Sequence, residues 1–178
     1  VLNDYTPFYG DSSSIRRNQM LNPTFKVDTT GWSTWSATGV STFARVLTGG
    51  VDNGPFGRAT WTTNPTDGSG AINMAIAPVE CGIQYVSSVY VRPSKLMKMY
   101  LSVSWAYNGA STTSMVSAIT ICQPNVWTRL SVTGVCPVGS NQRNVQIVVP
   151  AGSGYDITLN SYVDVDMAVF EKGSTVQP

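Results

Sequence analysis

The sequence predicts an all-β fold, an antiparallel two-sheet β-sandwich of the jelly-roll type, and three observations support this prediction. Polar and apolar residues alternate with a period of two in several runs, as they do along half-buried strands. Clusters of Gly, Pro, Asn and Asp separate these runs. No helical periodicity persists for three turns. The number of strands within 178 residues favours one jelly-roll domain over a seven-stranded immunoglobulin domain.

The two clearest strands lie in the middle of the chain. The run 83–92 alternates, and Pro93 ends it because proline cannot donate to a ladder. The run 98–107 alternates in the same way and ends at the turn formed by Asn108 and Gly109. Further strands are expected at 42–47, 57–63, 71–77, 115–121, 127–133, 144–149 and 162–171. The expected core residues are Phe25, Tyr85, Val89, Leu101, Val103, Trp105, Trp127, Leu130, Ile147 and Phe170.

Composition argues against several classes of function. Charged residues make up 12% of the chain and the net charge is +1, without the basic stripe that nucleic-acid binding requires. No apolar run approaches the ~18 residues of a transmembrane helix, and the N-terminus lacks the pattern of a signal peptide. The chain contains no His, which removes the commonest general base. We therefore expect no nucleic-acid partner, no membrane insertion and no enzymatic activity, since most acids also fall in predicted turns.

The outward faces of the predicted strands are polar but nearly uncharged, and aromatic rings lie among the polar residues. Such a face suits a neutral polyhydroxylated ligand, which binds by ring stacking and by hydrogen bonds to amides and hydroxyls. The simpler alternative is that polar residues face water on any half-exposed strand. A shared groove requires that the strands carrying Tyr90 and Tyr100 lie in one sheet. The candidate ligand-binding residues are Trp35, Gln84, Tyr90, Arg92, Tyr100 and Asn144.

The three cysteines are Cys81, Cys122 and Cys136, an odd number whose spacing fits no zinc motif. Buried free thiols are the favoured interpretation. One disulfide is the alternative, and the sequence does not assign its pair.

Several motifs occur in order along the chain: LNPTF at 21–25, GW at 31–32, YVSSVYVR at 85–92, LSVSW at 101–105, WTRLSVTG at 127–134 and SYVDVDMAVFEKGS at 161–174. Together they resemble the jelly-roll carbohydrate-binding modules of families four, nine and twenty-two. They are most similar to the version found in minor tail proteins of bacteriophages that infect actinobacteria and related hosts. The resemblance extends from about Arg17 to Ser174.

This resemblance implies roles for single residues. Phe25 would be buried on a first core strand, Asn22 would tie down its loop, Trp32 would be partly packed, and Trp35 would be free to contact a ligand.

The family's last strand often carries acids that help to hold a structural calcium, which makes Asp164 and Asp166 the metal candidates. Lys26, however, replaces the carboxylate that the family supplies after the Phe, and it would repel a cation. The alternative is that both acids cap backbone amides or face solvent. No cofactor is required.

The resemblance also implies an organisation and a function. Residues 1–16 would be an N-terminal linker or inter-module connector, 17–174 the carbohydrate-binding-module-like β-sandwich, and 175–178 a C-terminal tail. The expected function is non-catalytic binding of host cell-surface or cell-wall glycan by a phage tail during adsorption. The protein would be located in the virion and act outside the cell. Its partners would be the glycan, other tail proteins and further copies of itself. The alternative is a structural tail-tip protein without a glycan ligand.

Overall fold

The protein is a β-sandwich, as predicted. The computed structural model describes residues 18–35, 39–66, 68–152 and 154–175, and no helix occurs among them. This part of the chain accordingly has no helix long and apolar enough to cross a membrane. The strands are β1 (Trp32–Trp35), β2 (Ser41–Val46), β3 (Phe56–Trp61), β4 (Gly70–Pro78), β5 (Gln84–Pro93), β6 (Met97–Tyr107), β7 (Ala110–Val116), β8 (Thr120–Cys122), β9 (Thr128–Val135), β10 (Gln142–Val149) and β11 (Tyr162–Lys172).

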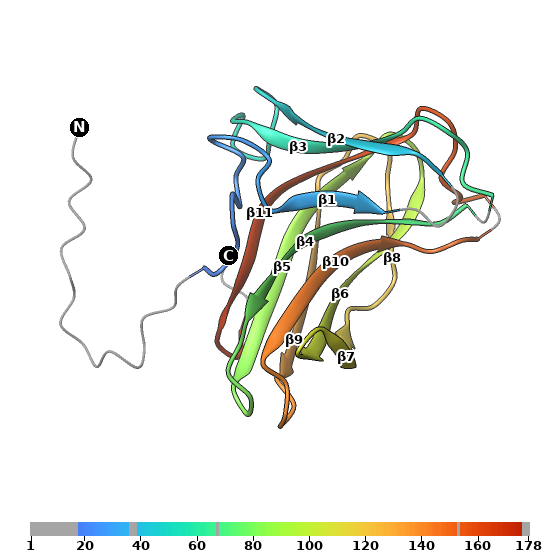
Figure 1. Cartoon of the computed structure of the whole chain (residues 1–178). Coiled ribbons are helices and arrows are strands. Elements are labelled where there is room, and N and C mark those ends of the chain that lie inside the picture. Colours follow the sequence, from blue (N-terminus) through green and yellow to red (C-terminus); the bar gives the residue numbers. More distant parts are fainter. Residues whose placement is uncertain (1–17, 36–38, 67, 153, 176–178) are drawn as a thin grey trace, which may run out of the picture.

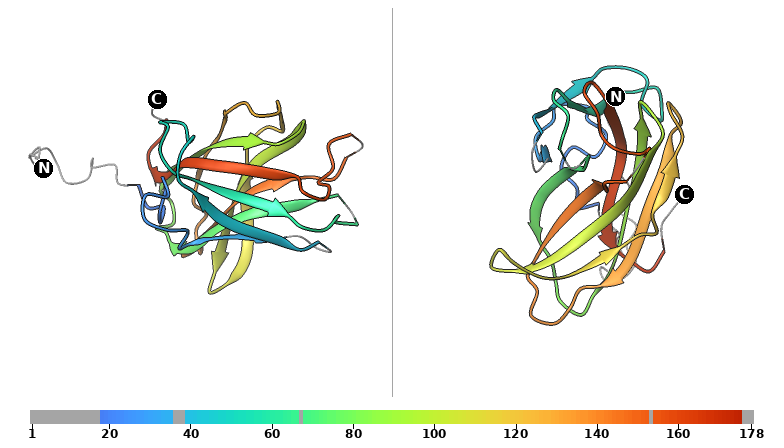
Figure 2. Two further views of the ribbon diagram at one scale, coloured as in Figure 1. Left: turned by 90° about the horizontal axis from the view of Figure 1, so that it is seen from above. Right: turned by 90° about the vertical axis from the view of Figure 1, so that its right-hand side faces the viewer.

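The strands form two antiparallel sheets. Sheet A has the order β1-β4-β10-β6-β7, with β8 also paired to β6, and sheet B has the order β2-β3-β11-β5-β9. Figure 1 shows β1, β4, β10 and β6 side by side in this order, and Figure 2 shows the sandwich from two further directions. Consecutive strands change sheet repeatedly, as between β4 and β5 and between β9 and β10. This alternation is the jelly-roll type of connectivity that the sequence predicts.

Aromatic rings from both sheets meet in the core. The Tyr85 ring on β5 stacks on Phe170 of β11 with centroids 4.9 Å apart, and Trp105 of β6 lies 5.8 Å from Tyr85. All of the predicted core residues except Trp127 are buried. Trp127 is the exception because it lies just before β9 and contacts Arg92 and Phe56 on the outer face of sheet B. Its placement in the core was wrong.

The observed strands differ from the prediction at several places. β1 was not among the expected strands, and β7 begins earlier than expected, at Ala110. The predicted strand 115–121 is divided between β7 and β8. The segment around the LNPTF motif forms turns instead of a first core strand. Asn22 and Phe25 have positive φ angles of 44° and 53°, which are incompatible with a continuous ladder.

The expected side-chain roles in the LNPTF segment are nevertheless confirmed. Phe25 is buried, and Asn22 donates hydrogen bonds to Asp28 and to the Thr30 carbonyl.

Residues 1–16 and 176–178 lie outside the described residues, so the expected connector and most of the expected C-terminal tail stay predictions.

Candidate functional site

The outer face of sheet A carries an aromatic row that crosses four strands. Cross-strand pairing joins Trp35 on β1 to Ala71 on β4, Ala71 to Val148 on β10, and Val148 to Tyr100 on β6. Side chains in one such row point to the same side of the sheet. Trp35 and Tyr100 therefore stand at the two ends of a row whose middle is formed by two small aliphatic side chains. Trp35 is 52% exposed, so its ring is available to a ligand.

A polar row runs directly beside the aromatic row. It consists of Ser33 on β1, Asn73 on β4, Gln146 on β10 and Ser102 on β6, joined by cross-strand pairing. Gln146 Nε2 donates a hydrogen bond to Asn73 Oδ1 at 2.6 Å, which fixes the two amides relative to each other. The row thus presents two oriented amide groups and the exposed hydroxyl of Ser33, whereas Ser102 is buried. Each member of the polar row lies two residues along its strand from a member of the aromatic row.

A recess continues the polar surface toward the other end of the sheet. Asn144 pairs with Ser104, and Ser104 pairs with Ser114, with a hydroxyl–hydroxyl hydrogen bond of 3.1 Å. The recess has a volume of about 170 Å³. Its lining residues are Ser104, Ala106, Gly109, Ser111, Gln142, Arg143 and Asn144. We call the aromatic row, the polar row and this recess together the polar face of sheet A.

The polar face has almost no charge. In the described strands of sheet A, no residue is an Asp or a Glu. Lys98 has its ammonium 4.3 Å from the centroid of the Tyr155 ring, so this cation is already engaged. Arg143, which lines the recess, is buried with its guanidinium 4.2 Å from the centroid of the Phe170 ring. The face therefore supplies rings, amides and hydroxyls, and it lacks the carboxylate pair that glycoside hydrolysis uses.

The predicted site residues are divided between the two sheets. Trp35, Tyr100 and Asn144 lie on the polar face of sheet A. Gln84, Tyr90 and Arg92 lie on β5, in sheet B, and the outward side of that sheet is the opposite side of the sandwich. The shared groove required the strands of Tyr90 and Tyr100 to lie in one sheet, and this condition is not met, because β5 and β6 lie in different sheets. A sandwich cannot bring the two outer faces together, so these six residues cannot form one groove.

Asn73, Gln146 and Ser102 were missing from the predicted site. A sequence signal exists for all three. Gln146 alternates in phase with Asn144 and Ser102 with Tyr100, so each points to the same side as its partner. Asn73 lies between the apolar Ile72 and Met74. Their adjacency depends on the pairing of β4 with β10, for which the sequence carries no local signal.

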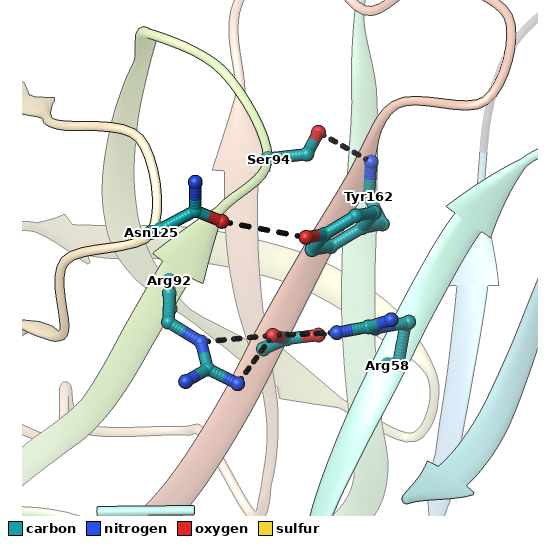
Figure 3. Close-up of polar contacts among 6 residues, drawn as sticks. Arg58, Arg92, Ser94, Asn125 and Tyr162 are labelled. Carbon is teal, nitrogen blue, oxygen red and sulfur yellow. Dashed lines mark hydrogen bonds and ion pairs between the residues drawn. The ribbon is translucent and has the colours of Figure 1, made fainter. Parts of the chain in front are cut away.

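Arg92 has a structural role on the outer face of sheet B (Figure 3). Arg92 and Arg58 point toward Asp164 from β5 and β3, with ion pairs of 2.9 Å and 2.6 Å. Arg92 also lies over the Trp127 ring and Arg58 over the Tyr162 ring, at 4.4 Å and 3.9 Å from the centroids. The carboxylate of Asp164 is fully buried beneath this layer of guanidinium groups and rings.

These contacts bear on the expected calcium site. Both carboxylate oxygens of Asp164 accept hydrogen bonds from arginines, which does not fit a calcium ligand. The Asp166 oxygens accept from the backbone N–H groups of Val51 and Met167. Within the described residues, no group of three or more acidic, Cys or His side chains could hold a metal ion. The calcium site stays a prediction and enters no part of the function below.

Burial affects the acidity of Asp166. Its pKa is raised above the ordinary value, chiefly because burial disfavours the charged carboxylate, while the two backbone N–H groups oppose this effect.

Neither a protein-family model nor a curated protein sequence matches this chain. Solved structures of the same fold do. The CBM22-1 xylan-binding domain of Xyn10C from Paenibacillus barcinonensis is 13% identical, with a TM-score of 0.64, and the match covers 92% of this chain and 100% of that domain. TmCBM61, solved in complex with β-1,4-galactotriose, is 16% identical with a TM-score of 0.54, covering 88% of this chain and 99% of that module.

A phage protein also has this fold. The enzymatically active domain of tailspike protein 4 of bacteriophage CBA120 is 11% identical, with a TM-score of 0.66. The match covers 88% of this chain but only 21% of that chain. At these identities the similarities establish the fold, an all-β sandwich of the type found in carbohydrate-binding modules.

Proposed function

We propose that this chain is a non-catalytic glycan-binding domain whose ligand lies on the polar face of sheet A. The observation that carries the proposal is the aromatic row, with Trp35 and Tyr100 at its ends, directly beside the row that contains Asn73 and Gln146. Sugar rings stack their C–H faces on aromatic side chains, and their hydroxyls pair with amides and hydroxyls. The fold similarity to a xylan-binding domain and to a module bound to β-1,4-galactotriose supports the same assignment.

The preferred ligand is an uncharged oligosaccharide. The strands of sheet A carry no acid in the described residues, and Lys98 is held against Tyr155. Trp35 and Tyr100 are separated by three strand spacings, about 14 Å at the backbone. A ligand that contacts both rings therefore spans several strands, which requires an oligosaccharide and not a single sugar. Affinity of ~10⁻⁴–10⁻⁵ M is expected for such a shallow surface.

The test is calorimetric titration of the wild type, Trp35→Ala and Tyr100→Ala with neutral oligosaccharides from xylan and galactan and with actinobacterial cell-wall polysaccharide. Loss of one stacking ring should weaken binding about tenfold. Tyr90→Ala is the matched control, because Tyr90 is an aromatic residue on the outer side of sheet B. Normal binding by both sheet A variants, or loss of binding in the control, would refute the assignment of the site.

We further propose that the domain acts in a bacteriophage tail, where it binds host cell-wall glycan during adsorption. The sequence resemblance to phage minor tail proteins and the fold similarity to a phage tailspike support this role. Weak sites become effective there when many copies act together. The partners would be other tail proteins and further copies of this chain, and the location would be the virion. Peptides of this chain should be found by mass spectrometry in purified tails, and their absence would contradict the role.

A structural role in the tail is the second candidate. Val116, Ile119 and Ile121 are exposed at the β7–β8 edge of sheet A and could contact a neighbouring subunit. Sedimentation velocity distinguishes the two roles. The structural role is favoured if the wild type self-associates, if Ile121→Lys abolishes this association, and if the chain binds none of the tested glycans.

A further inference from the structure

Two chain segments cross between the sheets side by side at one end of the sandwich. One leads from β4 to β5 through Val79–Ile83, and the other leads from β9 to β10 through residues 136–141. Val79 N donates a hydrogen bond to the Asn141 carbonyl at 3.1 Å. At the other end of the same crossings, Gly82 N donates to the Cys136 carbonyl at 2.7 Å. The residue that follows Cys81 is thus hydrogen-bonded to Cys136.

The hydrogen bonds at this point have the pattern of a β-bulge. Cys136 N donates to the Ile83 carbonyl at 2.9 Å, so Gly82 and Ile83 both face Cys136. Gly82 has a φ angle of 76°, a conformation that glycine adopts without strain. Because Gly82 directly follows Cys81, its hydrogen bond to the Cys136 carbonyl places the two cysteines on adjoining segments of the two crossings. Disulfides join residues whose Cα atoms lie about 4.4–6.8 Å apart.

The two thiols also differ in access. Cys81 is exposed in its turn, whereas Cys136 is buried, and neither forms a disulfide in this structure. Burial raises the pKa of the Cys136 thiol, and the neighbouring Cys81 raises it further. Cys122 lies elsewhere, on β8, where burial raises its pKa to about 11. Cys122 is therefore the unpaired member of the three.

We propose that Cys81 and Cys136 form a disulfide when the protein meets an oxidising thiol–disulfide pool such as oxidised glutathione. The exposed Cys81 thiolate attacks one glutathione sulfur, forms a mixed disulfide and releases one reduced glutathione. Cys136 then loses its proton to solvent and attacks Cys81 Sγ, and the second glutathione leaves. In total the two thiols lose two electrons and two protons, and one oxidised glutathione becomes two reduced molecules.

The disulfide would join the two crossings covalently. It closes a loop of about 55 residues, and constraint of the unfolded chain by such a loop stabilises the fold. It also anchors one wall of a recess of about 370 Å³ lined by Gln19, Ala77, Pro78, Val79, Glu80 and Tyr85. Because disulfides persist outside the reducing cytosol, the bond is suited to a protein that acts extracellularly. The inference does not depend on the glycan site, which lies on the outer face of sheet A.

The test uses the full chain with oxidised glutathione, alkylation of the remaining thiols, and trypsin digestion without reduction. Trypsin separates the cysteines into the peptides 59–95, 99–129 and 130–143, because it does not cleave between Arg92 and Pro93. We expect a cross-linked pair of peptides 59–95 and 130–143 with the mass of two hydrogen atoms missing. The oxidised protein should unfold at higher denaturant concentration than the reduced protein.

Three variants make the result specific. Cys122→Ser should form the same cross-link, whereas Cys81→Ser should not. Cys136→Ala provides a second negative variant without a buried hydroxyl, and its fold is checked by circular dichroism. The proposal is overturned if glutathione stays attached to Cys81, if Cys81 links two molecules to each other, or if peptide 99–129 carries the cross-link.

Discussion

Gln146 on β10 donates a side-chain hydrogen bond of 2.6 Å to Asn73 on β4. The bond connects neighbouring strands in the middle of the polar row and orients both amides toward the outer side of sheet A. An amide side chain has two donor hydrogens and an acceptor oxygen, so each group retains capacity for a ligand after this bond is made. The pair is therefore pre-oriented before a glycan arrives, which reduces the entropic cost of binding.

Gln146→Ala should weaken glycan binding about tenfold, since it removes one amide contact and releases Asn73 from its fixed orientation. The denaturation midpoint should stay close to that of the wild type, because the side chain lies on the partly exposed outer face. Titration calorimetry and urea unfolding measure the two effects. Gln84→Ala on sheet B is the matched control, and an equal loss of affinity there would contradict this prediction.

Trp105→Ala should lower the free energy of unfolding by roughly 3–5 kcal/mol. Trp105 is buried and its ring contacts Tyr85 and Phe170, so the substitution leaves a cavity between the sheets. Trp35→Ala is the matched comparison, since its ring is 52% exposed, and it should change the unfolding free energy by less than about 1 kcal/mol. Equal effects of the two substitutions in urea unfolding would show that the face assignment is inverted.

Asp164→Ala should destabilise the fold by about 2–3 kcal/mol. The substitution leaves Arg58 and Arg92 facing each other without the buried carboxylate that accepts hydrogen bonds from both. The expected cost is below that of a fully buried pair because water reaches the arginines, whose side chains are 32% and 21% exposed. Glycan affinity should not change, because these residues lie on sheet B. A variant as stable as the wild type would mean that the ion pairs contribute nothing.

The raised pKa of Asp166 determines the sign of its effect on stability. A carboxyl group with a folded-state pKa above its unfolded value stabilises the fold at pH values below the unfolded pKa, and this contribution is lost as the pH rises through the folded pKa. The stability of the wild type relative to Asp166→Asn should therefore decrease as the pH rises from about 3 to 6. Carbon NMR of the Asp166 carboxyl provides the direct measurement, and a pKa below the ordinary value would contradict it.

Calcium should not stabilise the protein, because arginines occupy both oxygens of Asp164 and backbone N–H groups occupy those of Asp166. Thermal unfolding with calcium and with EDTA should give the same midpoint. If calcium raises the unfolding midpoint of the wild type but not that of Asp166→Ala, the expected metal site exists and this prediction is wrong.

The sequence by itself determined the fold class, the turns and the direction of most side chains. Alternation alone places Leu101 inside and Tyr100 outside on the same strand, because side chains in a strand point to opposite faces in turn. This property depends only on neighbouring residues, so one sequence is enough to predict it. The exposure of the Trp35 ring was expected from the family resemblance, and its ring is exposed.

Only the tertiary structure decided which outward faces belong together. The strands of Tyr90 and Tyr100 are consecutive, yet β5 and β6 lie in different sheets, and Tyr100 shares a row with Trp35, distant in the sequence. Trp127 is a large aromatic residue of the kind expected in the core, but its ring packs against Arg92 on the outer face of sheet B. Sheet membership depends on pairing between residues far apart in the chain, which the local alternation of polar and apolar residues does not encode.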